Sequence, residues 1–527
     1  MKITTAAWVL LSCSLAALGC GTEPFTPPCA EGDTCDAEPA AEPSEEACLE
    51  GLAALRVQAG CGVFASEIWG DDGNPGTMDQ PVKTLARAIE LAPRARGRVF
   101  ACAAGSFTEA VTLPSGIDLW GGFACWSRWR HYTEGATNKP ALLVSSNAAG
   151  PAITVVAAQS DSEVVTDGVS TIVDMRLLSE DPLEANLDVV ALRLQPGAVV
   201  QVLRSEIQAA AGLTGAHGAD AGYVDPSPAH GEIGAIGKDA CSAATVTGGG
   251  AVTTVCGDLI STGGKGGDGT PDRGGAGEDG KPLSTPNLSD AGLGGAGAKD
   301  GAPCEHGSRG EDGAPGAPGA GGQDGRLTVA GWEGVPGGHG GTGAPGQGGG
   351  GGGGAPGGRS ACGNGALGGA SGGSGGGGGC GGSGGRGGGP GGASIAILAP
   401  PASKLTLRET RVITGSGGPG GRGGRGQLGG QGVQGGPPGR PPEMGGEYAC
   451  RGGYGGWGGT GGYGGGGAGG PSIGIAYADD EQLTLDRVTF EIGPAGPGGI
   501  ADVEDETRDR ANRGSDGFAA ETMRFAP

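Results

Sequence analysis

The feature that most constrains this chain is glycine at every third position, from Gly307 to Gly325 and again from Gly334 to Gly349. A period of three fits an extended left-handed helix with three residues per turn, in which only glycine lets neighbouring backbones approach closely. Such segments have no side chains from which to build a core. They must pack through their backbones or remain unfolded.

Three outcomes follow from this composition. Collagen-like trimers use the same period, but these runs are short, poor in proline and interrupted from Gly348 to Gly354. A bundle of polyglycine-like helices within one chain is the second outcome. Disorder is the third, because glycine loses the most conformational entropy on ordering. The residues favour the last two equally.

A second pattern predicts that some of the chain folds as stacked strands. Three copies of one apolar motif recur, the second 205 residues after the first and the third 78 residues after the second. Each copy holds two short alternating strands that cannot bury an apolar face alone, so neighbouring copies must stack. The long glycine-rich intervals then leave the stack at one corner. The copies are Val190–Leu192 with Val200–Val202, Ser394–Ile397 with Leu405–Leu407, and Ser472–Ile475 with Leu483–Leu485.

The block before these copies predicts one helix followed by short strands. Residues 70–77 have turn chemistry, and Leu85, Ala88, Ile89 and Ala92 recur at helical spacing. Strand-forming runs follow, separated by Gly, Ser and Pro turns. The expected strands are Arg98–Cys102, Glu109–Leu113 and Ile117–Trp120.

Residues 72–77, 81–85 and 116–123 resemble the N-terminal end of pectin-lyase-like right-handed parallel β-helices. The resemblance covers roughly residues 62–125. It implies an all-β fold, a right-handed parallel β-helix or solenoid, with the N-terminal helix capping its open end. Leu85, Ile89 and Ala92 are then expected to face the first coil.

The N-terminus indicates export. Residues 6–18 are mostly apolar but too few to cross a bilayer as a helix, and a small residue precedes Cys20. Residues 17–20 resemble the bacterial lipobox, which implies removal of residues 1–19, lipidation of Cys20 and membrane attachment through that lipid. The alternative is an ordinary signal peptide, with Cys20 joining a disulfide.

Cysteine usage agrees with an oxidising compartment. Without Cys13 and Cys20, twelve of the fourteen cysteines remain, an even number. The candidate disulfides pair neighbours along the chain, and Cys304 and Cys450, the cysteines of the inserts outside these local pairs, are expected to join the two inserts. The local pairs are Cys48 with Cys61, Cys102 with Cys125, Cys241 with Cys256, and Cys362 with Cys380.

The net charge of −23 opposes binding to nucleic acid, despite RGG-like pieces at Arg422 and Arg425. No catalytic motif, cofactor motif or metal-ligand spacing is recognisable, and a metal site at residues 304–306 lacks a second ligand pair. The acidic clusters at residues 71–72 and 479–481 are interpreted as loop acids. The five histidines lack a local catalytic partner; they are His131, His217, His230, His306 and His339.

Four aromatic residues in the second insert have two interpretations. Tyr448, Tyr454, Trp457 and Tyr463 either anchor glycine loops onto the solenoid or stack on sugars of a surface polysaccharide. The first interpretation is preferred.

The chain is therefore divided into a signal peptide, a disordered lipidated tether and alternating coils and inserts. The pattern as a whole resembles PGRS-type glycine-rich surface proteins, most closely the myxobacterial lipoproteins. This resemblance implies the class of protein and a location at the outer membrane or cell surface, and the preferred hypothesis is a non-enzymatic structural or adhesive role there. The alternative is a β-helical polysaccharide lyase or hydrolase, or a glycan-binding protein. The divisions are 1–19, 20–47, 48–212, 213–392, 393–414, 415–470 and 471–527.

Overall fold

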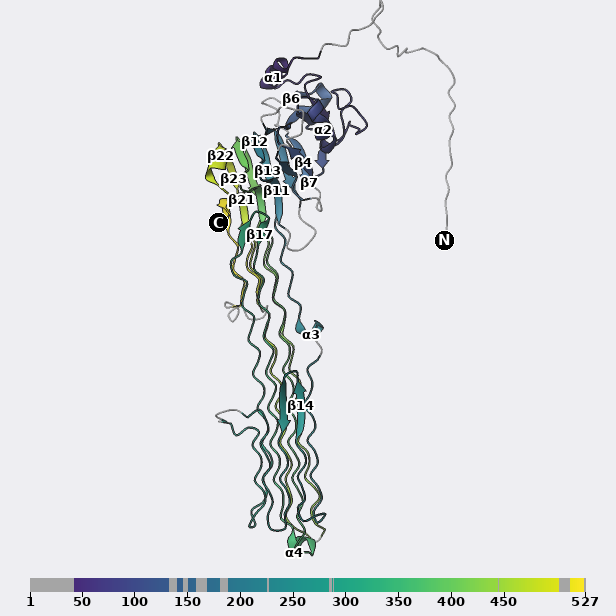
Figure 1. Ribbon diagram of the computed structural model, residues 1–527, viewed down its shortest axis with the longest axis vertical. Helices are drawn as coiled ribbons and strands as arrows, with labels where there is room; N and C mark the ends of the chain where they lie inside the picture. Colours follow the sequence, from purple (N-terminus) through teal and green to yellow (C-terminus); the bar gives the residue numbers. More distant parts are fainter. Residues whose placement is uncertain are drawn as a thin grey trace, which may run out of the picture.

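The computed structural model shows a sheet-rich end from which a long, narrow bundle of extended segments projects (Figure 1). Cys20 and the signal sequence lie outside the described residues, so lipidation stays a prediction. The structure describes residues 42–131, 140–145, 150–157, 168–180, 188–224, 227–283, 287, 289–443, 445–501 and 512–525. No helix within these ranges is long and apolar enough to cross a bilayer.

The fold is mostly β, and its main strands form three parallel sheets. Sheet A consists of β1 (Val63–Ala65), β2 (Arg98–Cys102), β5 (Asp118–Ala124), β9 (Val169–Val173), β12 (Val199–Leu203), β19 (Lys404–Arg408) and β22 (Leu483–Asp486), with β6 (Arg130–His131) antiparallel to β5. Sheet B consists of β3 (Ser106–Thr108), β7 (Ala141–Ser145), β10 (Met175–Ser179), β13 (Glu206–Ala209), β20 (Arg411–Thr414) and β23 (Thr489–Glu491). Sheet C consists of β4 (Val111–Pro114), β8 (Ile153–Val156), β11 (Val189–Leu194), β18 (Ser394–Ala399), β21 (Ser472–Tyr477) and β24 (Ala519–Arg524). The predicted strands after the helix are confirmed as β2, β4 and β5.

The chain visits the sheets in a fixed order in its later part. From β11 onward it passes from sheet C to sheet A to sheet B, and then makes a long glycine-rich excursion before the next sheet C strand. The excursions follow β13, β20 and β23, so all three leave between sheets B and C. The sequence predicts the first two excursions. It assigns the third, within residues 492–518, to the last coil, and the structure corrects this assignment.

Strand registers match the sequence repeats. Val190 pairs with Ile395, and Val200 pairs with Leu405, both 205 residues apart. Ser394 pairs with Ser472 and Leu405 with Leu483, both 78 residues apart. The predicted stacking of the three copies is therefore confirmed at the level of register.

Apolar side chains from all three sheets form one core. Leu119, Leu192 and Leu407, from different strands, are fully buried within it. Helix α2 (Leu85–Leu91) continues into a single 3-10 turn, η1 (Ala92–Arg94), and packs on β1, β2 and β4. The predicted inward-facing Leu85 and Ile89 are buried in the same core, as is Ala92.

Helix α2 begins where side chains satisfy its first backbone N–H groups. The Thr84 hydroxyl accepts from the N–H of Arg87, and the Glu109 carboxylate accepts from Leu85 and Ala86 at 2.7 and 3.0 Å. Burial raises the pKa of Glu109 despite these bonds. Asp72 accepts the N–H groups of the two residues before the helix, at 2.9 and 2.8 Å, so this loop acid shapes the turn.

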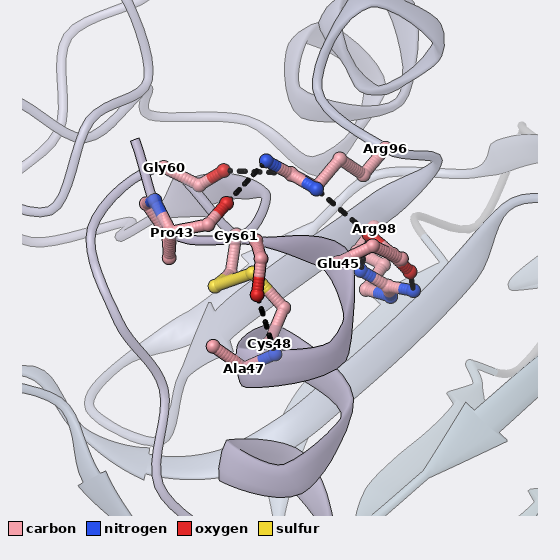
Figure 2. Close-up of a disulfide and its surroundings, with 9 residues drawn as sticks. Pro43, Glu45, Ala47, Cys48, Gly60, Cys61, Arg96 and Arg98 are labelled. Atoms are coloured by element: carbon pink, nitrogen blue, oxygen red, sulfur yellow. Dashed lines mark hydrogen bonds and ion pairs between the residues drawn. A yellow bond between two sulfur atoms is a disulfide. The ribbon is translucent and has the colours of Figure 1, made fainter. Parts of the chain in front are cut away.

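The folded part begins earlier than the predicted end of the tether. Helix α1 (Glu45–Ala53) is capped by Ser44 and held by the Cys48–Cys61 disulfide (Figure 2). Glu45 also pairs with Arg96 and Arg98 on the sheet-rich end. These contacts explain why residues 45–47 fold although their composition resembles a linker.

Two ladders of alternating charge cross the strands at the surface. In sheet B, Arg176, Glu206, Arg411 and Glu491 lie on successive strands, joined by ion pairs at 2.7, 3.0 and 2.5 Å. Like charges on adjacent strands repel, so alternation favours this register over a slipped one.

The second ladder stands at the corner between sheets A and B. Asp174, Arg204, Glu409 and Arg487 all have positive φ there, between 45° and 52°. Asp174 pairs with Arg204 at 2.7 Å, and Glu409 pairs with Arg487 at 2.6 Å. Burial raises the pKa of Asp174, but hydrogen bonds and charge from His131 and Arg204 outweigh it, and the net pKa is lowered.

Candidate functional site: the glycine-rich stalk

We call the glycine-rich excursions, residues 212–392, 415–470 and 493–517 as far as they are described, the stalk. It contains only short elements: α3 (Ala221–Val224), α4 (Gly358–Cys362) and the hairpins of β14 (Val252–Cys256) with β15 (Leu259–Gly263) and β16 (Arg326–Thr328) with β17 (Gly331–Glu333). The other described residues run as extended segments along its length (Figure 1). At about 3.1 Å per residue, residues 415–440 span roughly 80 Å.

Backbone hydrogen bonds join each segment to several neighbours. In the central segment, the N–H groups of Gly375, Gly376 and Gly377 donate to Gly264, Gly453 and Glu232, at 2.8, 3.0 and 2.8 Å. Three consecutive residues therefore face three different segments, as a helix of three residues per turn requires. The arrangement is the intrachain polyglycine-like bundle, one of the two outcomes that the sequence left equally favoured.

The proportion of glycine in a segment of the stalk increases with the number of other segments that surround it. Segment 307–319 lies at the edge of the stalk, and its intervening residues, such as Ala314 and Pro315, are exposed. Every third residue faces inward, and a Cβ at Gly313 would collide with the carbonyl oxygen of Ala344. An edge segment thus needs glycine only at the inward position, which produces the period of three.

The interruption of that period marks a place where one segment is enclosed. Gly348, Gly351 and Gly354 donate to the carbonyls of residues 281, 278 and 275. On other sides the same segment bonds to Ser308 and Gly376. Because no face remains for a side chain, every residue from 348 to 354 is glycine.

Histidine and aspartate side chains supply acceptors that the backbone lacks. The N–H of Gly313 donates to the carbonyl of Trp457 at 2.7 Å, while the preceding Asp312 accepts the N–H of Trp457 at 2.8 Å. We call this reciprocal pair a side-chain clamp. Among the described residues of the stalk, six clamps join parallel segments: His217 to Arg422, Asp220 to Arg425, His230 to Gln431, Asp239 to Arg440, His306 to Arg451 and Asp312 to Trp457.

Antiparallel segments use the same device with a shifted register. The N–H of Gly269 donates to Val246, and the preceding Asp268 accepts from Gly248, two residues further on. Burial raises the pKa of Asp268, but this hydrogen bond and Lys265 outweigh it and lower the pKa. The other described clamps between antiparallel segments join Asp279 to Gly294, His339 to Gly387 and Asp516 to Gly498.

Four of the five histidines therefore have a structural role in clamps, and the fifth, His131, pairs with Asp174 at 2.9 Å. Sequence reasoning missed the clamps because Asp-Gly normally indicates a turn. The available signal was His or Asp directly before the Gly or Ala at the inward position of a three-residue period.

Disulfides tie the segments together across the stalk. Two local pairs are confirmed, Cys48–Cys61 and Cys102–Cys125, and so is the Cys304–Cys450 link between inserts. The predicted pairs Cys241–Cys256 and Cys362–Cys380 are wrong. The structure pairs Cys241 with Cys362 and Cys256 with Cys380, at sequence separations of 121 and 124 residues.

The physical reason is the extended conformation of the segments. Cys241 and Cys362 lie at the connections at the far tip, where α4 stands in Figure 1. Cys256 and Cys380 lie part-way along, on the β14 hairpin and the central segment. Cysteines that are close in sequence are therefore far apart along the stalk, and the two cysteines of each disulfide lie at the same distance along its axis.

The remaining candidates have ordinary partners. The sulfur of Cys304 is in a disulfide and His306 is in a clamp, so residues 304–306 do not form a ligand set. Asp480 accepts from the Tyr477 hydroxyl at 2.7 Å, and Asp479 lies 3.7 Å from Arg524. Among the described residues, no three His, Cys, Asp or Glu side chains are grouped to hold a metal ion.

Aromatic side chains of the second insert lie on the stalk itself. Tyr448, Tyr454, Trp457 and Tyr463 are 70, 51, 52 and 40 % exposed. None belongs to the apolar clusters of the sheet-rich end. The interpretation that they anchor glycine loops onto the sheets is therefore wrong, because the loops are held by backbone bonds.

The fold and these surfaces define a mostly β protein with parallel sheets and a backbone-bonded stalk. Comparison with protein families gives no match, and comparison with curated proteins gives none either. Among solved structures, a GH136 lacto-N-biosidase from Eubacterium ramulus is similar at 16 % identity, over 28 % of this chain and 26 % of that one, with a TM-score of 0.18. The matched region is thus about a quarter of that enzyme's length.

Proposed function

We propose that this chain is a non-enzymatic surface lipoprotein with a structural or adhesive role. One observation carries the proposal: the stalk is held by backbone hydrogen bonds and cross-linked by disulfides between residues that are 121 to 146 positions apart. A rod of this kind holds a surface away from its base without needing an apolar core.

In this proposal the three sheets are the faces of a right-handed parallel β-helix, each passage of the chain through sheets C, A and B is one coil, and α2 caps the first coil. The sequence before residue 42 attaches the base to the outer membrane or cell surface through lipid on Cys20. The PGRS-type resemblance supports the same class. Two acidic side chains of the sheet-rich end have structural partners, since Asp72 holds a turn and Asp174 belongs to a charge ladder.

Intact mass tests the anchor. Protein extracted with detergent from native membranes is expected to begin at Cys20, with added acyl mass and a gain of two protons on reduction for each of the five described disulfides. Cys20→Ala is expected to release the protein from membranes, whereas Cys13→Ala, within the removed signal, leaves the mature mass unchanged. An unlipidated soluble form that cleaves acidic polysaccharides contradicts the proposal and favours the enzyme.

A further inference from the structure

Segment 451–463 presents one row of side chains to solvent. Positions 451, 454, 457, 460 and 463 are exposed, and the two glycines between each pair are almost all buried. We call Tyr454, Trp457 and Tyr463 the aromatic stripe. Tyr454 and Trp457 are three residues apart, which corresponds to about 9 Å along the segment, and Trp457 and Tyr463 are separated by twice that distance.

The stripe begins beyond the described part of a neighbouring segment, residues 493–501. Nearer the sheets, residues 493–501 lie beside this segment, and Gly499 donates to Gly467 at 2.8 Å. A Cβ at Gly466 would collide there with the carbonyl oxygen of Gly499. Residues 464–470 are accordingly only Gly and Ala. Further from the sheets, the positions on the same side of the segment carry Tyr463, Thr460, Trp457 and Tyr454. The aromatic side chains thus point into the lane that residues 493–501 occupy closer to the base.

The floor of this lane offers hydrogen-bond donors. Gly417, Gly420 and Gly423 donate to the carbonyls of residues 494, 497 and 500, each at 2.9 Å. Gly426, Gly429 and Gly432 continue the same phase, and no described residue accepts their N–H groups. As far as the described residues show, this lane therefore combines aromatic faces with backbone donors, both at three-residue intervals.

We propose that the aromatic stripe binds a neutral polysaccharide chain that lies along the stalk. Sugar rings stack their C–H faces on aromatic rings, and their hydroxyl groups accept from N–H donors. Another glycine-rich strand is excluded, because the aromatic side chains stand where its backbone would have to pack against segment 451–463, whereas a sugar ring can stack on their exposed faces. A protein partner needs a contiguous apolar core, whereas glycine separates these rings. The inference rests on the proposed adhesive role and names its ligand class.

Co-sedimentation of the full chain with microcrystalline cellulose, chitin and insoluble amylose tests this site. Binding to at least one of them is expected. Substituting Tyr454→Ala, Trp457→Ala and Tyr463→Ala together is expected to weaken that binding at least roughly tenfold, because all three stacking rings are lost. The matched Phe substitutions retain it.

The control removes an equally exposed aromatic pair elsewhere. Trp69 and Trp126 are 54 and 53 % exposed, with ring centroids 6.1 Å apart. Trp69→Ala with Trp126→Ala is expected to leave binding unchanged. Binding to none of the three polysaccharides overturns the inference, and so does binding that survives the triple alanine variant. Intact mass and disulfide mapping on the same preparations show separately whether the anchored stalk of the proposed function is present.

Discussion

Replacing Gly459 with valine is expected to destabilise the stalk by about 3 kcal/mol, at the upper end of the usual cost of overpacking. The N–H of Gly459 donates to Ala344 at 2.9 Å, and a Cβ would collide with the carbonyl oxygen of Ala314. That carbonyl cannot move aside freely, because it accepts the N–H of Ala344 at 2.8 Å. Scanning calorimetry should show a lower unfolding midpoint.

The adjacent residue provides the control. Thr460 is exposed and in the same segment, so Thr460→Val adds a similar side chain without a backbone collision. Its midpoint is expected to stay near that of the unmodified protein. Equal effects of the two valines would show that segments do not pack at the described distance.

Removing the Cys304–Cys450 disulfide is expected to cost about 4 to 5 kcal/mol, the loop-entropy value for a closed loop longer than 100 residues. The two cysteines are 146 residues apart and join two glycine-rich inserts. Glycine-rich chain has unusually large entropy when unfolded, so constraining it is especially stabilising. The Cys304→Ser, Cys450→Ser variant should therefore unfold at lower urea concentration.

The short loop gives the comparison. Cys48 and Cys61 are 13 residues apart, and their double serine variant is expected to lose only about 3 kcal/mol. This loss should affect the sheet-rich end and leave the stalk transition in place. A stalk transition that is indifferent to Cys304 and Cys450 would contradict the role of this disulfide.

The sequence allowed the sheets to be predicted where a pattern repeats in register. The copies containing Val190, Ile395 and Ile473 could be aligned because their offsets are constant, and those offsets became strand pairings. The charge ladders were not recognised. Arg176, Glu206 and Arg411 are unrelated residues until that register places them on neighbouring strands.

The stalk was predictable in kind but not in its connections. The period of three indicated polyglycine-like helices, yet composition alone could not decide between packing and disorder. The predicted disulfide between Cys241 and Cys256 is wrong because it takes neighbours in sequence to be neighbours in space. In an extended segment, residues close in sequence are instead separated along its axis.

Amide hydrogen exchange across residues 371–392 tests the account most directly, because this central segment has backbone partners on several sides. Its N–H groups, such as those of Gly376 and Gly382, donate at 3.0 and 2.9 Å to residues 453 and 459. The bundle predicts strong protection here and weaker protection in exposed positions of segment 307–319. Exchange at the rate of an unstructured chain throughout residues 371–392 would show that the stalk is disordered and contradict the account.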